Sequence, residues 1–466
     1  RDNKWSNKKK IIIGATLASL SLVLVIIIII LVSRNGRGND KKEDENKEEQ
    51  NHDLNDKIGE IECIYNFDYV GETQILSNEF KKSSEFDIYI GDSKIKFTKS
   101  YKFLDPGEHK IKYVLFEGIN MDCMFSGVSS LLSVKMESNK NAKVISMANA
   151  FENCDSLYNF QISGFNTKEL KSLRKAFYNT KISHLDIFDT SNVEDMSYMF
   201  ALTDIESLDL SKFSTSKVKN MSYMFYGCPL LYSVNFEGCD TANVEDMSHI
   251  FEFCTTLEEI DLSSLNTKKL KNMSNMFGNC ISLRLINITK IDTSLVTDMS
   301  SIFDECNSLT QINLNNLVTN NAKNMSKMFN NCNRLSSLDL ANFDTSNVED
   351  MSHMFAYCRN LRTLIIDTFD TRKVKDMSYM FYYNLELGAL DVSKMVTSSA
   401  TNMSNMFGDC TVLTKLDVEH FDTSNVVDMS GMFKDCNGLR QLEIKNFKTD
   451  KVKNMESMFM GCFYLT

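Results

Sequence analysis

Hydrophobic residues return at a fixed interval through the C-terminal three quarters of the chain. The clearest mark is a phenylalanine that ends the motif M-x-x-M-F. It occurs at Phe125, Phe151, Phe177, Phe200, Phe225, Phe251, Phe277, Phe303, Phe329, Phe355, Phe381, Phe407, Phe433 and Phe459. Eleven of the 13 intervals are 26 residues, and the other two, 23 and 25 residues, fall between Phe177 and Phe225. A period in this range predicts a stacked repeat architecture.

The unit around Phe355 shows how polar and apolar positions divide one repeat. Residues 338–340 alternate apolar and polar, which predicts a short strand with both leucines inward and Asp339 outward. Residues 344–347, Asp-Thr-Ser-Asn, are typical of a turn or a helix cap. Val348, Met351 and Met354 then follow at helical spacing, ahead of Phe355. This last part predicts a short helix or 3₁₀ turn that faces the core.

One such unit cannot bury its apolar face alone, whereas stacked units bury a continuous core. We therefore predict an α/β solenoid over residues 119–466, with 14 units in a right-handed, leucine-rich-repeat-like coil. A parallel β-sheet forms one face, and short helices or 3₁₀ turns form the other. The methionines of the motif, part of 26 in the chain, are predicted to fill the core.

Residues 58–118 differ from the repeats in composition and in the pattern of their apolar positions. Four stretches, residues 60–70, 86–90, 94–97 and 109–116, carry β-branched and aromatic side chains, and turn signals separate them. This predicts three or four short strands. They form either a β-rich cap on the first coil or an independent small β domain.

The N-terminal region predicts a membrane anchor. Residues 11–32 carry no charge and span about 33 Å as a helix, enough for the hydrocarbon core of a bilayer. A cleaved signal peptide has a shorter apolar stretch and a small-residue cleavage site, which is not seen here. The count of positive charges on the two sides narrowly favours residues 1–10 as a cytoplasmic tail, with the repeats outside the cell. Residues 33–57 are highly charged and predict a solvated spacer.

Composition excludes several functions. The net charge of -11 argues against nucleic acid and anionic lipid as partners. The six histidines are scattered, with no pair at metal-ligand spacing. There is no Gly-rich phosphate loop, no G-x-S-x-G and no nucleophile with a singled-out histidine. We expect neither an enzyme nor a bound cofactor or metal.

The repeat resembles a narrower class. Units such as residues 342–355, NFDTSNVEDMSHMF, and 421–433, FDTSNVVDMSGMF, resemble the BspA-type leucine-rich repeat surface proteins with DUF285-like repeats of 26 residues. The resemblance implies a surface-displayed protein that adheres to, or recognises, an extracellular or host protein. A structural spacer or surface-coat antigen without a specific ligand is the alternative.

Cysteine forms a ladder of its own. Ten of the 13 cysteines stand three residues after the anchor phenylalanine. They are Cys154, Cys228, Cys254, Cys280, Cys306, Cys332, Cys358, Cys410, Cys436 and Cys462. Neighbours would lie close to disulfide distance, but stacked identical side chains point in parallel. We favour free buried thiols over disulfides.

Outward strand positions are the candidate ligand face. One set varies between units and flanks the predicted strands: Tyr232, Glu258, Arg284, Arg362 and Arg440. A second set forms an acidic row: Asp209, Asp261, Asp339, Asp391 and Asp417. The acidic row could bind Ca²⁺, although interleaved asparagines favour a solvated face. Variation in the first set fits either a ligand surface or an unconstrained one.

Two further positions that recur in each repeat, here called slots, carry residues that suggest a function. Asp and Asn alternate one residue before the first methionine of the motif, and several of these asparagines begin N-x-S/T, the glycosylation sequon. We expect the slot to make a structural hydrogen bond. His249 and His353 share a slot with Tyr198 and Tyr223, so we expect interchangeable surface residues there.

Overall fold

The computed structural model describes residues 52–466. The predicted cytoplasmic tail (1–10), transmembrane helix (11–32) and most of the spacer lie outside the described residues. The end of the spacer holds a 3₁₀ helix, η1 (Leu54–Asp56), which Asp53 caps by accepting from the backbone of Asn55. Among the residues that the structure describes, no helix is long and apolar enough to cross a membrane.

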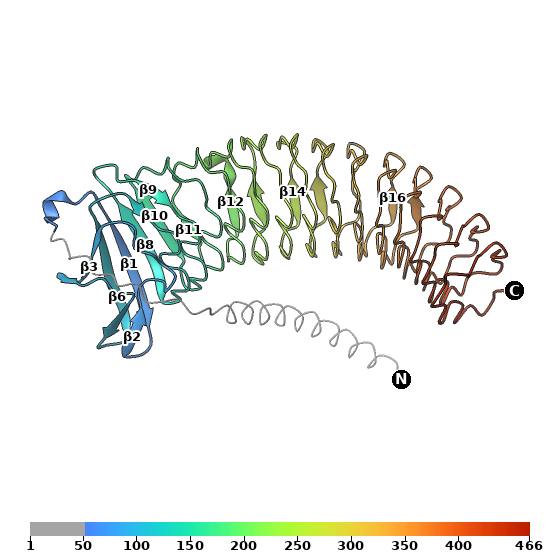
Figure 1. The fold of residues 1–466 in the computed structure, drawn as a ribbon, viewed down its shortest axis with the longest axis horizontal. Coiled ribbons are helices and arrows are strands. Elements are labelled where there is room, and N and C mark those ends of the chain that lie inside the picture. Colours follow the sequence, from blue (N-terminus) through green and yellow to red (C-terminus); the bar gives the residue numbers. More distant parts are fainter. Residues whose placement is uncertain (1–51) are drawn as a thin grey trace. The chain divides into compact units, whose positions relative to one another are not determined.

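The described chain begins with a sheet of seven strands (Figure 1), whose order is β11-β10-β8-β1-β6-β3-β4. Their bounds are β1 (Gly59–Phe67), β3 (Phe86–Ile90), β4 (Ser93–Ile95), β6 (Gly107–Leu115), β8 (Leu131–Glu137), β10 (Asn159–Ser163) and β11 (His184–Leu185). Two smaller pairs stand beside it: β2 (Gly71–Gln74) with β5 (Ser100–Phe103), and β7 (Ile119–Asn120) with β9 (Val144–Ser146).

Strand β1 joins the N-terminal strands to the repeats. It pairs antiparallel with β6 on one side and with β8 on the other, and β8 pairs parallel with β10. The buried ring of Tyr113, in β6, lies edge-on to Phe125, the first anchor phenylalanine, with ring centroids 5.7 Å apart. Residues 59–115 and the first coils therefore share one hydrophobic core.

The remaining coils stack one upon the next toward the C-terminus (Figure 1), which confirms the predicted solenoid. In the unit around Phe355 the strand is β16 (Ser337–Asp339). Its middle residue Leu338 is buried and Asp339 is exposed, as the alternation predicts. The other short strands are β12 (Ser207–Asp209), β13 (Ser233–Asn235), β14 (Glu259–Asp261), β15 (Leu285–Asn287) and β17 (Thr363–Ile365).

The predicted parallel sheet is present only in pieces. Strands pair in parallel as β12 with β13, β14 with β15, and β16 with β17, but these pairs do not join into one sheet. The longest ladder between coils lies elsewhere. Single parallel bridges link the Asp/Asn slot of each coil to the next, from Ser172 through to Asn454. The coils are thus held together at this slot more regularly than at the strands.

Of the two forms predicted for the M-x-x-M-F segment, a short helix or a 3₁₀ turn, the helix is wrong. Besides η1, the described residues contain one more 3₁₀ helix, η2 (Leu210–Lys212), and no α-helix. The motif instead forms consecutive turns, in which the amide of Met354 donates to the carbonyl of Met351 within the coil. Alternate amides, such as those of His353 and Phe355, donate to the next coil. Because each turn contains a residue at positive φ (57° at His353 and 59° at Tyr357), the backbone cannot propagate as a helix.

The anchor phenylalanines form a spine through all the coils. Each ring stacks on the next, with neighbouring centroids 5.5 to 6.0 Å apart. The first methionine of the motif is fully buried in every coil from Met196 to Met429. The predicted core role of these methionines is confirmed.

All 13 cysteines are free thiols. The structure gives a reason that spacing alone does not reveal. The Cys358 Sγ–H donates to the carbonyl of Phe329 in the preceding coil (3.0 Å), and the other ladder cysteines repeat this bond. Each sulfur is thus directed at a backbone oxygen. Burial raises the pKa of the Cys358 thiol to about 12, so it stays protonated.

A threonine ladder closes the turn after each strand. The hydroxyl of Thr345 donates to the carbonyl of Asp370 in the next coil (3.0 Å) and accepts from the amide of the same residue (2.8 Å). The same slot is buried from Thr167 to Thr423. One side chain therefore satisfies two backbone groups of its neighbour.

Candidate functional site on the strand face

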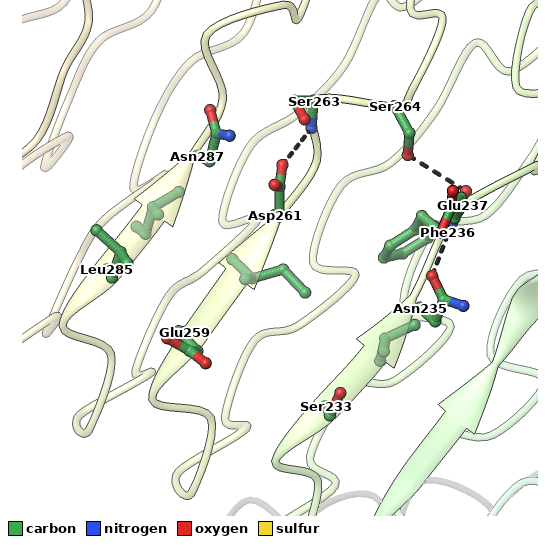
Figure 2. A pocket seen from close by; sticks show the side chains of 13 residues that line it. Ser233, Asn235, Phe236, Glu237, Glu259, Asp261, Ser263, Ser264, Leu285 and Asn287 are labelled. Atoms are coloured by element: carbon green, nitrogen blue, oxygen red, sulfur yellow. Dashed lines mark hydrogen bonds between the residues drawn. The ribbon is translucent and has the colours of Figure 1, made fainter.

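The strand face turns two rows of side chains outward. In β13, β14 and β15 the middle residue is buried and both flanking residues point outward. Figure 2 shows the outer rows, with Ser233, Glu259 and Leu285 in line on one side and Asn235, Asp261 and Asn287 on the other. Because strand residues alternate between faces, the pattern of the sequence fixes this arrangement.

A shallow depression of about 880 Å³ lies over these three strands. Its floor is made by the outward residues of β13 to β15 and by the turns that follow them, including Glu237 and Ser264. The Ser264 hydroxyl donates across to the carbonyl of Phe236 (3.3 Å), which ties two coils together at the edge of the depression. Leu285 adds an apolar side chain to the lining and is 55% exposed.

The charged side chains that line the depression are all acidic. Its lining contains three carboxylates, Glu237, Glu259 and Asp261, and no basic side chain. Hydrogen bonds from Ser263 hold the pKa of Asp261 below its usual value, with smaller contributions from Asn287 and the charge of Lys290. Asp261 is therefore ionised at neutral pH, and the depression is negative.

The variable set of candidate residues falls on this face in register. Tyr232, Glu258, Arg284 and Arg362 each directly precede a strand, at the start of β13, β14, β15 and β17. Tyr232 is 54% exposed, and Arg440 also lies exposed, in a later coil. Tyr232, Glu258 and Arg284 lie on successive coils, whereas Arg362 and Arg440 lie on later coils of the stack.

Two of these arginines already have partners. Arg284 forms an ion pair with Glu258 of the preceding coil, and Arg362 lies 3.6 Å from Glu386. The first pair joins opposite charges that stand one repeat apart, so the sequence itself indicates it. These exposed pairs add little stability and leave the side chains accessible.

The five aspartates of the acidic row are turn acceptors. Each carboxylate accepts a hydrogen bond from the backbone amide two residues later, at 2.8 to 3.3 Å. This holds for Asp209, Asp261, Asp339, Asp391 and Asp417. They stabilise the turn after the strand while the rest of each carboxylate faces solvent. Among residues 52–466, no group of three or more His, Cys, Asp or Glu is placed to hold a metal ion.

The Asp/Asn slot is structural, as predicted. Asn272 and Asp350 each accept from the amide two residues later, at 3.1 and 2.8 Å, and most other members of the slot do the same. The asparagines of the N-x-S sequences are therefore engaged in the turn.

The histidine slot, predicted to hold interchangeable surface residues, holds Tyr and His side chains that stack on one another. Tyr198, Tyr223 and His249 stack face to face, with centroids 4.3 and 4.1 Å apart, and His353 stacks on Tyr379 at 4.6 Å. All five are half-buried along the turn edge of the coils. The stacks form because equivalent side chains of adjacent coils point the same way, a contact that only the stacking distance reveals.

Comparisons with known proteins agree with this architecture. A family model described as "Mycoplasma protein of unknown function, DUF285" matches residues 119–231, 145–260, 201–285, 282–389, 334–417 and 384–465. Among solved structures, a leucine-rich repeat protein from Eubacterium ventriosum ATCC 27560 is similar at 13% identity and a TM-score of 0.36, over 71% of this chain and 90% of that one. The TLR13–ssRNA13 complex is similar at 16% identity and a TM-score of 0.23, over 74% of this chain and 56% of that one.

No curated protein matches significantly. The solved structures are too distant for any argument about function. The family segments, in contrast, overlap to cover residues 119–465, about three quarters of the chain, with the repeat that the sequence predicts. The chain belongs to the DUF285 family of repeat proteins.

Proposed function

We propose that this protein is a membrane-anchored surface protein whose repeat solenoid recognises another protein, in adhesion to a host or neighbouring cell, through the strand face. The observation that carries the proposal is the contrast between slots. The Phe, Met, Thr and Cys slots are each bound to a neighbouring coil, whereas the slot before each strand is exposed and changes from Tyr232 to Glu258 to Arg284. Change at such positions costs the fold little, so they are free to carry specificity.

The anchor and the location are proposed from the sequence. Residues 11–32 supply an uncharged segment of bilayer length, and the charged segment after it would hold the coils away from the membrane. Carbonate extraction of membranes tests this: the full chain is expected to stay with the membrane, and a chain lacking residues 1–32 to be released. Protease treatment of intact cells should digest the repeats, and full protection would refute the outward orientation.

Recognition by the strand face is tested by charge reversal. A variant with Arg284→Glu, Arg362→Glu and Arg440→Glu is compared with a control carrying Lys217→Glu, Lys269→Glu and Lys373→Glu. The control reverses three exposed cations whose ammonium groups donate to asparagines of the preceding coil, away from the strands. Both variants are first checked for an unchanged circular dichroism spectrum and melting temperature.

If the strand face recognises a partner, the arginine variant changes the binding of intact cells to a target-cell layer, while the lysine control binds as wild type does. Equal binding by both variants would contradict recognition through this face.

The second candidate is a structural spacer or coat protein. It is favoured by the phenylalanine spine and the bridges at the Asp/Asn slot, which join the coils along the whole stack. A spacer requires length and stiffness but no particular surface. Deleting one 26-residue unit, for example residues 349–374, would then alter function in proportion to length, whereas the arginine variant would behave as wild type.

A further inference from the structure

We propose that the depression over β13 to β15 is the docking site for a positively charged, extended segment of the partner protein. The inference rests on the proposed function, because it names the chemistry of a partner bound on the same face.

Charge complementarity is the first argument. Glu237, Glu259 and Asp261 line the depression without a basic residue among them. Within residues 52–466, neither Glu237 nor Glu259 has an ion-pair partner. Such uncompensated carboxylates repel anionic partners and attract cationic ones, which gives specificity as well as faster association.

The nearby cations do not cancel this charge. Arg284 at the edge of the depression is paired with Glu258, and Lys212 lies 3.9 Å from Asp209. Lys290 is close enough to influence Asp261 but does not line the depression. Of these three cations, only Lys290 forms no ion pair in the described structure.

The shape of the depression favours an extended chain. Glu259 and Asp261 point to the same side from one strand, about 7 Å apart, which matches the spacing of alternate side chains in an extended segment. Leu285 lies in the same row as Glu259 and leaves more than half of its side chain exposed (Figure 2). A segment with lysine or arginine at alternate positions and one apolar residue would meet both features.

The break in the sheet between β13 and β14 contributes to the depression. β13 pairs with β12, and β14 pairs with β15, but β13 and β14 do not pair with each other. The depression crosses this break. Here the face is hollowed instead of being a flat sheet, so it can receive an extended segment laid alongside β14.

The probe is a short fluorescent peptide in which lysine alternates with threonine around one central leucine. A peptide with glutamate in place of lysine is its control. Fluorescence anisotropy measures binding to the full chain in detergent micelles. The test variant combines Glu237→Gln with Glu259→Gln, neither of which makes a side-chain hydrogen bond in the described structure.

The matched variant combines Asp367→Asn with Glu443→Gln. These two exposed acids occupy outward positions of the same face in later coils, so the change in net charge is equal. We expect the lysine peptide to bind wild type and the matched variant alike, and the test variant at least about tenfold more weakly. Binding should weaken steeply as salt rises.

Three outcomes would overturn the proposal: an equal loss in both variants, no binding of the lysine peptide, or equal binding of the glutamate peptide. Binding of vesicles rich in anionic lipid through these same residues would also overturn it. The cell-binding assay with the arginine variant is independent. If that assay succeeds while the peptide test fails, recognition stands and only the cationic partner is rejected.

Discussion

The interruption of the cysteine ladder at Asn384 predicts a stabilising substitution. Asn384 occupies the cysteine slot and is fully buried. Its amide Nδ2 donates to the carbonyls of Phe355 and Phe381, both at 2.9 Å, but its Oδ1 is buried without a hydrogen-bond partner. Asn384→Cys keeps a donor toward Phe355 and removes the orphaned oxygen.

The magnitude follows from these contacts. A buried acceptor without a partner costs about 1–3 kcal/mol, whereas the lost second hydrogen bond is worth about 1 kcal/mol. The two side chains are close in size, so the cavity term is small. We expect a net stabilisation of about 1 kcal/mol, measured as a higher urea midpoint and slower amide exchange in residues 381–410.

The reverse substitution provides the control. Cys410 donates from Sγ to the carbonyl of Phe381 in the normal manner of the ladder (3.1 Å). Cys410→Asn should therefore destabilise the protein, because it introduces the same orphaned oxygen in the next coil. If Asn384→Cys lowers the urea midpoint while Cys410→Asn leaves it unchanged, the hydrogen-bond role assigned to the ladder is incorrect.

Three other predictions test the remaining contacts. Thr345→Val should cost about 1–3 kcal/mol in urea unfolding because one backbone amide of the next coil loses its acceptor; Thr449→Val, at an exposed end of the same ladder, should cost little, and equal costs would refute the ladder. Burial raises the pKa of Asp304 to about 6, so the native state favours the protonated acid and the stability it contributes is lost as pH rises from about 4 through 6. Asp304→Asn should then raise the free energy of unfolding at pH 7 by up to about 3 kcal/mol and change it little at pH 4; no difference between the two pH values would contradict this. In the native protein without reductant, alkylation should reach the half-buried Cys123 and Cys462 first, and all 13 cysteines once the chain is unfolded; thiols that stay blocked after unfolding would show disulfides.

The sequence alone determined the repeat, the place of each segment within one coil and most of the core residues. A 26-residue period with Phe, Met, Thr and Cys at fixed slots is compatible with few folds. Each apolar slot is buried only when an equivalent slot of the next coil covers it. The inward and outward alternation of the strands followed from the same pattern, and so did the structural role of the Asp/Asn slot.

Tertiary structure decided what the spacing could not. Val348, Met351, Met354 and Phe355 have helical spacing, yet the segment forms turns, because its amides bond alternately within the coil and to the next coil. A hydrogen bond between coils has no counterpart in an isolated segment, so local periodicity could not indicate it. The stacking of Tyr223 on His249 escaped prediction for the same reason.

For the candidate site, too, the sequence predicted some features and the tertiary structure decided others. The sequence placed Tyr232, Glu258 and Arg284 on one exposed row, since their slots vary while others are constant. It did not indicate that β13 and β14 fail to pair, nor that a depression forms over them with Glu259 and Leu285 on its floor. Those features depend on how far neighbouring coils separate at the strands, a distance that only the packing of the complete stack sets.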